Sequence, residues 1–251
     1  MTSTTIERSA TARTGTEPIL RLANVHSYIA ESHILQGISF DVLPGRVTVL
    51  LGRNGAGKTT TLRTILGLLP AREGTITLDG ANLTRESVHA VVRRGIGYVP
   101  EDRDVFAGLT VEQNLRLAQR PGATGERLAR AYDLFPDLKK RGAQRAGSLS
   151  GGQQQMVAIA RALVNDNRLL LIDEPSKGLA PVVVNQVTEA LVAVKGTTTI
   201  LLVEQNLAMA RALGDDAVII DDGRVVHAGS MDEVSGDEAL QARYLGVGGH
   251  A

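Results

Sequence analysis

The chain has 251 residues, of which 43% are hydrophobic and 22% are charged, and this composition is ordinary for a globular protein with a substantial core. Acidic and basic residues number 27 each, so the charge balance speaks against a nucleic-acid binder, which is usually clearly basic. Because cysteine is absent, the sequence excludes disulfides, a thiol nucleophile and cysteine-ligated metals, in agreement with a reducing compartment.

The N-terminal residues 1–17 differ in composition from the rest of the chain. They are rich in Thr, Ser, Ala and Arg and show no periodicity, which predicts a disordered tail rather than a targeting signal. Nowhere does the sequence approach the roughly 18 consecutive apolar residues that a membrane span needs. No internal repeat is visible, so we expect one copy of a single domain at residues 18–246.

Short apolar runs bounded by turn residues predict strands in the first part of this domain. The expected strands cover residues 19–25, 38–42, 47–51, 75–78 and 96–99. A Pro44-Gly45 turn precedes the third strand, and a glycine-rich loop and a helix at about 59–68 follow it. Asp79-Gly80, after the fourth strand, is a strong hairpin-turn dipeptide.

The pattern becomes helical over about residues 111–163, with breaks at Pro121-Gly122, Pro136 and Gly147. Apolar strands then return, separated by expected helices and by an Asp222-Gly223 turn before the last of them. These strands cover residues 169–172, 198–203, 217–220 and 224–226.

Strands that alternate with helices predict an α/β fold whose sheet is mainly parallel and carries helices on both faces. The helical stretch interrupts this alternation and is expected to form an inserted subdomain at about residues 102–161. The core is then expected at about 18–101 and 162–246.

Residues 52–59 read GRNGAGKT and match the complete P-loop pattern, after an expected strand and at the start of an expected helix. Backbone N–H groups of such a loop converge on phosphate oxygens. We expect Lys58 to reach the β- and γ-phosphates and Thr59 to place its hydroxyl on Mg²⁺. A chance glycine-rich loop is the alternative. The expected phosphate-binding residues are Asn54, Gly55, Ala56, Gly57, Lys58, Thr59 and Thr60.

Residues 169–174 read LLLIDE, an apolar strand that ends in two carboxylates. We expect Asp173 to be a Mg²⁺ ligand, usually through water, and Glu174 to polarise the attacking water as general base. Many buried strands end in an acid, so this assignment depends on the P-loop.

Residues 149–153 read LSGGQ and stand just before a helix that runs to about residue 163. Ser150, Gly151, Gly152 and Gln153 would form a second anion-binding helix N-terminus. An ordinary serine N-cap would look the same, so the residues alone leave the two interpretations open.

The P-loop, LSGGQ and LLLIDEP, in this order and spacing, resemble the ATP-binding-cassette (ABC) ATPases over about residues 19–246. The resemblance implies a P-loop core of the RecA-like type with a small antiparallel N-terminal β subdomain. It also implies that LSGGQ of one subunit caps the ATP held by the other in a head-to-tail dimer. Tyr28, between the first two expected strands, would stack on adenine, with a surface tyrosine as the alternative. Residues 176–180 would cross the dimer interface.

Two positions depart from the general family pattern. Glu101 stands where most members place a Gln that meets Mg²⁺ and the attacking water. Gln205 stands where most place a switch His, and a neutral amide can hydrogen-bond a γ-phosphate but offers no cationic imidazolium.

Both positions, with the segments YVPEDR, EPSKGLAP and LVEQN, resemble the LivF-type branch of branched-chain amino acid importers and its urea-importer relatives, in which they look normal. The resemblance implies a second, different ATPase, two transmembrane permease subunits and, indirectly, a substrate-binding protein. It implies a location at the cytoplasmic face of the cell membrane. Branched-chain amino acids, urea and short amides all stay open as solutes.

Three rival functions are less favoured by the sequence. A soluble ABC ATPase of DNA repair or translation would usually carry two cassettes or a long coiled coil, which are not visible here. A P-loop kinase or GTPase would not need LSGGQ. A non-hydrolysing subunit is contradicted by Lys58, Asp173 and Glu174.

The segment 102–115 joins Glu101 to the helical stretch and contains three apolar residues in a polar setting, Val105, Phe106 and Leu109. They would either form part of a docking groove for the membrane partner or pack into the subdomain's own core. The residues favour neither interpretation.

Overall fold

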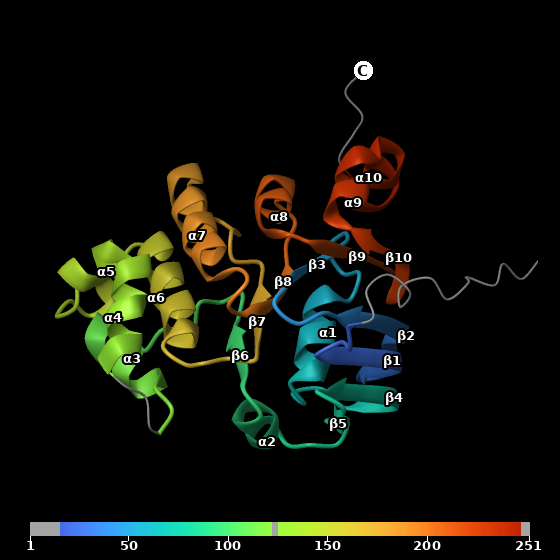
Figure 1. The fold of residues 1–251 in the computed structure, drawn as a ribbon, viewed down its shortest axis with the longest axis horizontal. Coiled ribbons are helices and arrows are strands. Elements are labelled where there is room, and N and C mark those ends of the chain that lie inside the picture. Colours follow the sequence, from blue (N-terminus) through green and yellow to red (C-terminus); the bar gives the residue numbers. More distant parts are fainter. Residues whose placement is uncertain (1–15, 122–124, 247–251) are drawn as a thin grey trace, which may run out of the picture.

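The computed structural model describes residues 16–121 and 125–246. Residues 1–15 of the predicted disordered tail lie outside this range. Two β-sheets and a separate group of helices make up the described part of the chain (Figure 1).

The larger sheet is mainly parallel. In the described residues it has six strands, in the spatial order β10 (Arg224–Ser230), β9 (Asp216–Asp221), β3 (Val47–Leu51), β8 (Thr199–Val203), β7 (Leu169–Asp173) and β6 (Ile96–Val99). Neighbours from β9 to β6 pair in parallel, and β10 pairs antiparallel with β9 through the turn at Asp222 and Gly223. The central strands are buried on both faces, which explains their continuous apolar sequences.

Alternate residues of the central strands supply two separate hydrophobic cores. Leu170 and Ile172 of β7 face a core that includes α6 (Gly151–Leu163), α7 (Pro181–Val194) and α8 (Leu207–Leu213). Leu169 and Leu171 face the opposite core, which includes α1 (Lys58–Ile65) and the second sheet.

The second sheet is antiparallel, with the order β2 (Ser32–Val42), β1 (Leu20–Ile29), β4 (Ala71–Leu78) and β5 (Ala81–Asn82). It covers α1, which therefore lies between the two sheets (Figure 1). The short helix α2 (Val88–Arg93) packs against this core, whereas α9 (Met231–Gly236) and α10 (Glu238–Leu245) pack against the opposite core, with α6, α7 and α8.

The helical stretch contains α3 (Val111–Ala118), α4 (Gly125–Leu134), α5 (Pro136–Lys140), the 3₁₀ turn η1 (Ala146–Ser148) and α6. These helices gather on the side of β6 and β7, away from the antiparallel sheet (Figure 1). The predicted α/β fold with a mainly parallel sheet, a small antiparallel N-terminal sheet and inserted helices is confirmed.

Several predicted boundaries were wrong. Helix α1 ends at Ile65 because Gly67 adopts a left-handed φ of 76°, and the N–H groups of Leu68 and Leu69 bond back to Arg63. The predicted break at Pro136, by contrast, is confirmed: α4 ends at Leu134, and Pro136 begins α5 at its first position, where its missing N–H costs nothing. Strand β4 begins four residues earlier than expected, at Ala71.

The first hairpin is longer than predicted, because its outer half lacks apolar alternation. Strand β1 continues to Ile29, which pairs with Ser32 across a two-residue turn. Tyr28 therefore lies inside β1, opposite His33, and not between two strands. Within the part of the chain that the structure describes, none of the helices combines the length and apolar character that a membrane span requires.

Candidate functional site

The candidate site lies where four parallel strands end. The carboxyl ends of β6, β7, β8 and β3 meet at one edge of the sheet, because neighbouring parallel strands run in the same direction. In open α/β sheets this edge is the usual place for a ligand. The loops after these strands carry most of the residues that the sequence singled out.

The loop after β3 is built around glycine. A Cβ at Gly52 would lie 2.2 Å from the carbonyl oxygen of Ile220, and the φ of Gly52 is 146°, so only glycine fits there. Gly57 has a φ of 108° and is the N-cap of α1, without a side-chain capping bond. Backbone N–H groups of the first turn of α1 are thus available to an anion.

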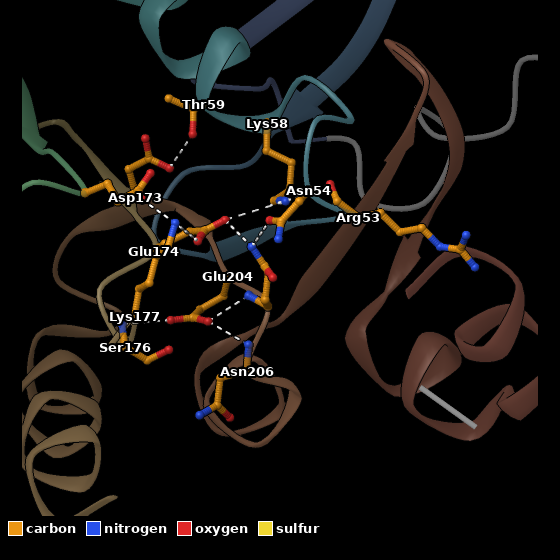
Figure 2. Close-up of polar contacts among 12 residues, drawn as sticks. Arg53, Asn54, Lys58, Thr59, Asp173, Glu174, Ser176, Lys177, Glu204 and Asn206 are labelled. Atoms are coloured by element: carbon orange, nitrogen blue, oxygen red, sulfur yellow. Dashed lines mark hydrogen bonds and ion pairs between the residues drawn. The ribbon is translucent and has the colours of Figure 1, made fainter. Parts of the chain in front are cut away.

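Lys58 folds back over the loop that precedes it. Its Nζ donates hydrogen bonds to the carbonyl oxygens of Gly52 (2.9 Å) and Arg53 (3.1 Å), and the side chain is only 4% exposed. Burial lowers the pKa of Lys58, and the nearby carboxylate of Glu174 opposes this by raising it. Figure 2 shows Lys58 directed toward the carboxylates after β7, while the guanidinium of Arg53 points away.

Asp173 and Thr59 meet across the sheet edge. The hydroxyl of Thr59 donates to Asp173 Oδ1 at 3.0 Å, whereas the buried Asp173 Oδ2 has no hydrogen-bond partner among the described residues. Burial raises the pKa of Asp173 to about 6, against the lowering effect of the Thr59 bond. An unpartnered buried carboxylate oxygen beside a hydroxyl is an oxygen donor set that suits Mg²⁺.

Glu174 is the centre of a polar cluster (Figure 2). Its Oε1 accepts a 2.6 Å hydrogen bond from Gln205 Nε2 and lies 3.6 Å from Lys58 Nζ. The same amide nitrogen donates to Asn54 Oδ1 at 2.6 Å. The backbone of Glu174 has a φ of 44°, a left-handed conformation that is uncommon for a residue with a side chain and often marks a functional site.

Lys177 joins two acids of the site. Its Nζ donates to Glu101 Oε1 and lies 3.7 Å from Glu174 Oε2. The bond to Glu101 raises the pKa of Lys177. Glu101 also raises the pKa of Asp173 by its charge, which places it within electrostatic reach of the expected metal ligands. Sequence reasoning expected Glu101 here but missed Lys177, because nothing in a local motif reports this pairing.

Glu204 was also missed, although an acid directly after a buried strand was a usable signal. It is 1% exposed, and it accepts hydrogen bonds from the backbone N–H groups of Ser176, Gln205 and Asn206. The bonds join the loop after β8 to the loop after β7.

Tyr28 has ring partners on both sides. It stacks on His33 with ring centroids 4.2 Å apart, and Arg72 Cζ lies 4.3 Å from its ring centroid. Strands β2 and β4 flank β1, so the two partners approach from opposite sides. A base that stacks on Tyr28 must displace one of them. Gly57 of the P-loop lies beside Ile34 and Leu35 of β2, so this hairpin borders the loop.

The LSGGQ residues lie elsewhere, at the start of α6 among the inserted helices (Figure 1). Ser150 is the N-cap, and it forms a reciprocal capping box with Gln153, with Ser150 Oγ accepting from Gln153 N and Gln153 Oε1 accepting from Ser150 N. A Cβ at Gly151 would lie 2.5 Å from Arg103 Nη1, so a guanidinium rests against this helix start. Arg103 is the last residue of the YVPEDR segment, and no local motif predicts its contact with LSGGQ.

The fold thus brings together most of the expected site residues at one sheet edge and leaves a second set apart. The first set comprises Asn54, Gly55, Ala56, Gly57, Lys58, Thr59, Thr60, Glu101, Asp173, Glu174 and Gln205. The second set comprises Ser150, Gly151, Gly152 and Gln153.

Comparisons with known proteins agree with this arrangement. A family model described as "ABC transporter" matches residues 35–177. The high-affinity branched-chain amino acid transport ATP-binding protein BraG of Pseudomonas aeruginosa is 38% identical over 232 residues, covering 91% of this chain and all of the relative. The probable branched-chain amino acid transport ATP-binding protein LivF of Archaeoglobus fulgidus is 35% identical and covers 91% of this chain and 99% of the relative.

A solved structure shares the fold. The nucleotide-free ATP-binding cassette of an ABC transporter superposes with a TM-score of 0.79 at 25% identity, covering 93% of this chain and all of the other.

Proposed function

The chain belongs to the ABC transporter family and is an ATP-hydrolysing subunit, and on that premise we propose that it powers the import of branched-chain amino acids. The observation that carries the mechanism is the cluster of Lys58, Gln205 and Asn54 around Glu174, next to the paired Asp173 and Thr59. The solute rests on the names of the two relatives. Urea or a short amide is the second candidate, on the sequence resemblance alone.

ATP phosphates fit the loop after β3. The uncapped first turn of α1 offers backbone N–H groups, and phosphate oxygens compete with the carbonyl oxygens of Gly52 and Arg53 for Lys58 Nζ. Within this loop Asn54, Gly55, Ala56 and Gly57 surround the phosphates, and Thr60 follows Thr59 on α1. Tyr28 stacks on the base once His33 or Arg72 moves.

Thr59 and Asp173 are the residues that would hold Mg²⁺, because the hydroxyl is in place and Asp173 Oδ2 is buried without a partner. The chemistry that a bound Mg²⁺ supplies there is neutralisation of charge on the transferred phosphoryl group. Glu101 joins this set only when Lys177 releases it.

Glu174 acts as general base in this scheme. It takes a proton from a water molecule as that water attacks the γ-phosphorus and the bond to the β–γ bridging oxygen breaks. Gln205 already donates to Glu174, and its second amide N–H, which donates to Asn54 Oδ1 here, would turn to the γ-phosphate so that one side chain orients both groups. The positive charge of Lys58 offsets the negative charges of the Glu174 carboxylate and the γ-phosphate.

The second set of residues completes a site on another subunit. Ser150, Gly151, Gly152 and Gln153 lie away from this chain's own P-loop, which suits a head-to-tail pair in which they cap the partner's ATP. We propose a heterodimer with a different ABC ATPase, bound to two permease subunits at the cytoplasmic face of the membrane, with a substrate-binding protein outside. A role in DNA repair or translation is not favoured.

Uptake measurements test the solute. Cells that lack this chain should lose uptake of radiolabelled leucine, and the wild-type chain should restore it, whereas a Glu174→Gln chain should not. If urea or amide uptake is lost and leucine uptake is unchanged, the transported solute is urea or a short amide instead. No change in any of the three would refute it.

A further inference from the structure

Glu204 is a buried carboxylate with three backbone partners. Its Oε1 accepts from Ser176 N at 3.0 Å, and its Oε2 accepts from Gln205 N and Asn206 N at 2.7 Å each (Figure 2). The residue is 1% exposed. A buried charge is costly unless it is hydrogen-bonded, and backbone N–H bonds to a carboxylate are among the stronger ones in proteins. The three hydrogen bonds therefore stabilise the buried carboxylate of Glu204. They also fix the positions of the peptide N–H groups of Ser176, Gln205 and Asn206.

These peptide groups belong to two different loops. The ladder between β7 and β8 ends with the pair Asp173 and Val203, followed by a bond from Glu174 N to the carbonyl oxygen of Val203 at 2.9 Å. Beyond that point the strands separate, and Glu204 continues the cross-link by reaching Ser176. The loop after β7 carries Glu174, and the loop after β8 carries Gln205.

The cross-link fixes how Gln205 faces Glu174. The backbone N–H of Gln205 is bound to Glu204, while its side-chain amide reaches Glu174 Oε1 at 2.6 Å. Asn206 is fixed in the same way, and its own side chain caps α8 by accepting from Met209 N at 3.1 Å. The start of α8 and the loop that holds Glu174 are thus tied through one side chain.

We propose that Glu204 is a positioning residue for ATP hydrolysis, which holds the Gln205 amide in register with the Glu174 carboxylate by tying their two loops together. This inference rests on the proposed function, because it assigns Glu174 and Gln205 to the hydrolytic step. Glu204 touches neither ATP nor the attacking water. It acts only by setting where the Gln205 amide lies relative to Glu174.

The test uses the full chain in its membrane complex and the variant Glu204→Gln, which keeps the shape of the side chain. An amide has one oxygen and one NH₂, so it cannot accept from both loops. We expect kcat for ATP to fall roughly 10- to 100-fold, the scale of a small misplacement of reacting groups, with KM changed by less than about threefold.

A double-variant cycle separates positioning from general structural support. In a Gln205→Ala background, the further change Glu204→Gln should cost less than about threefold in kcat, because the group it positions is already missing. The control Asp215→Asn removes another carboxylate that accepts a backbone N–H, from Val47 at 2.9 Å, at the opposite end of the sheet. Its kcat should stay within about twofold of wild type.

Three results would overturn the inference. The first is an unchanged kcat in Glu204→Gln, and the second is a double variant in which the two single losses of kcat multiply. The third is an equal loss of kcat in Asp215→Asn when both variants have the same thermal stability. If Glu204→Gln does not fold, Glu204→Asp, which keeps the charge but is too short to span both loops, decides on the same criteria. Wild-type turnover and its loss in Glu174→Gln are measured alongside. If the wild type does not hydrolyse ATP, or if Glu174→Gln hydrolyses it normally, the proposed function is wrong. If both results are as expected, the experiment tests only the role of Glu204.

Discussion

The side-chain amide of Gln205 donates a 2.6 Å hydrogen bond to Oε1 of Glu174. The two residues come from the ends of adjacent strands, β8 and β7, so the pairing of these strands sets their distance. The hydrogen bond therefore orients the carboxylate of Glu174, the expected general base, before the attacking water binds. The consequences of this pairing can be measured.

Glu174→Gln should leave ATP bound but lower the hydrolysis rate of the assembled transporter by roughly 10²- to 10⁴-fold, the usual worth of general-base catalysis. The glutamine keeps the shape of the side chain and loses only the proton acceptor. ATPase activity and nucleotide binding, measured on the same preparation, check this. Lys58→Ala is the companion variant and should weaken ATP binding or abolish turnover, because it removes the cation at the phosphates. Undiminished hydrolysis by Glu174→Gln would contradict the assignment.

Asp173→Asn should stabilise the protein when it is measured without nucleotide or metal. The pKa of Asp173 is raised to about 6 in the fold by burial, so the folded state favours the neutral form. Stability from this group is present at low pH and lost as pH rises through about 6. The variant's free energy of unfolding should therefore exceed that of the wild type most clearly above neutral pH. This difference should shrink by about 1 kcal/mol when the pH is lowered from about 7.5 to about 5.

Thermal or denaturant unfolding at the two pH values measures this effect. Asp216→Asn is the control, because it removes an ion pair in which Arg46 Nε lies 2.7 Å from Asp216 Oδ2, and it should destabilise the protein near neutral pH. A stabilisation by Asp173→Asn that does not depend on pH would refute the explanation.

The two ATP sites of the proposed heterodimer should differ in their response to pH. This chain's site uses the neutral amide of Gln205, whereas a partner with the usual His would offer a group that titrates between about pH 6 and 8. Each site is disabled in turn by changing its catalytic glutamate to Gln, and the remaining activity is measured against pH. The site of this chain should be slower or less sensitive to pH. Identical profiles, or a fully active homodimer in the native complex, would rule out the asymmetry.

Phe106→Ala should weaken assembly with the membrane subunits and leave ATP affinity nearly unchanged. The structure separates two of the three apolar residues of this segment: Val105 packs against the core, whereas Phe106 is 47% exposed. The backbone of Phe106 is held by the side chain of Asn114, which accepts from its N–H at 2.9 Å and donates to its carbonyl at 3.1 Å.

Co-purification of the membrane subunits measures assembly. Val192→Ala on α7 is the matched control, because Val192 is similarly exposed at 46% but lies on a different element. It should assemble like the wild type. Normal assembly of Phe106→Ala, or its loss of fold, would favour the packing interpretation.

The parts of the site that consist of consecutive residues could be predicted from the sequence. A P-loop, or a pair of acids after an apolar strand, is contiguous, and its strand-to-helix setting can be read from periodicity. The partnerships that organise the site are not local. Lys177 meets Glu101 across 76 residues of chain, and Tyr28 meets Arg72 only because β4 lies beside β1. Such pairs depend on strand order and register, which no short motif contains.

The reciprocal capping of Ser150 and Gln153 also bears on assembly. The start of α6 is closed by its own residues, so its backbone N–H groups are already aligned when a second subunit approaches. Ordering a loop on association costs conformational entropy, and a surface that is already ordered avoids this loss. In the proposed dimer, the affinity of the two ATPases for one another would then depend less on ordering of the LSGGQ segment and more on the bound nucleotide. In the proposed head-to-tail dimer, ATP would join two surfaces that are already ordered before they meet.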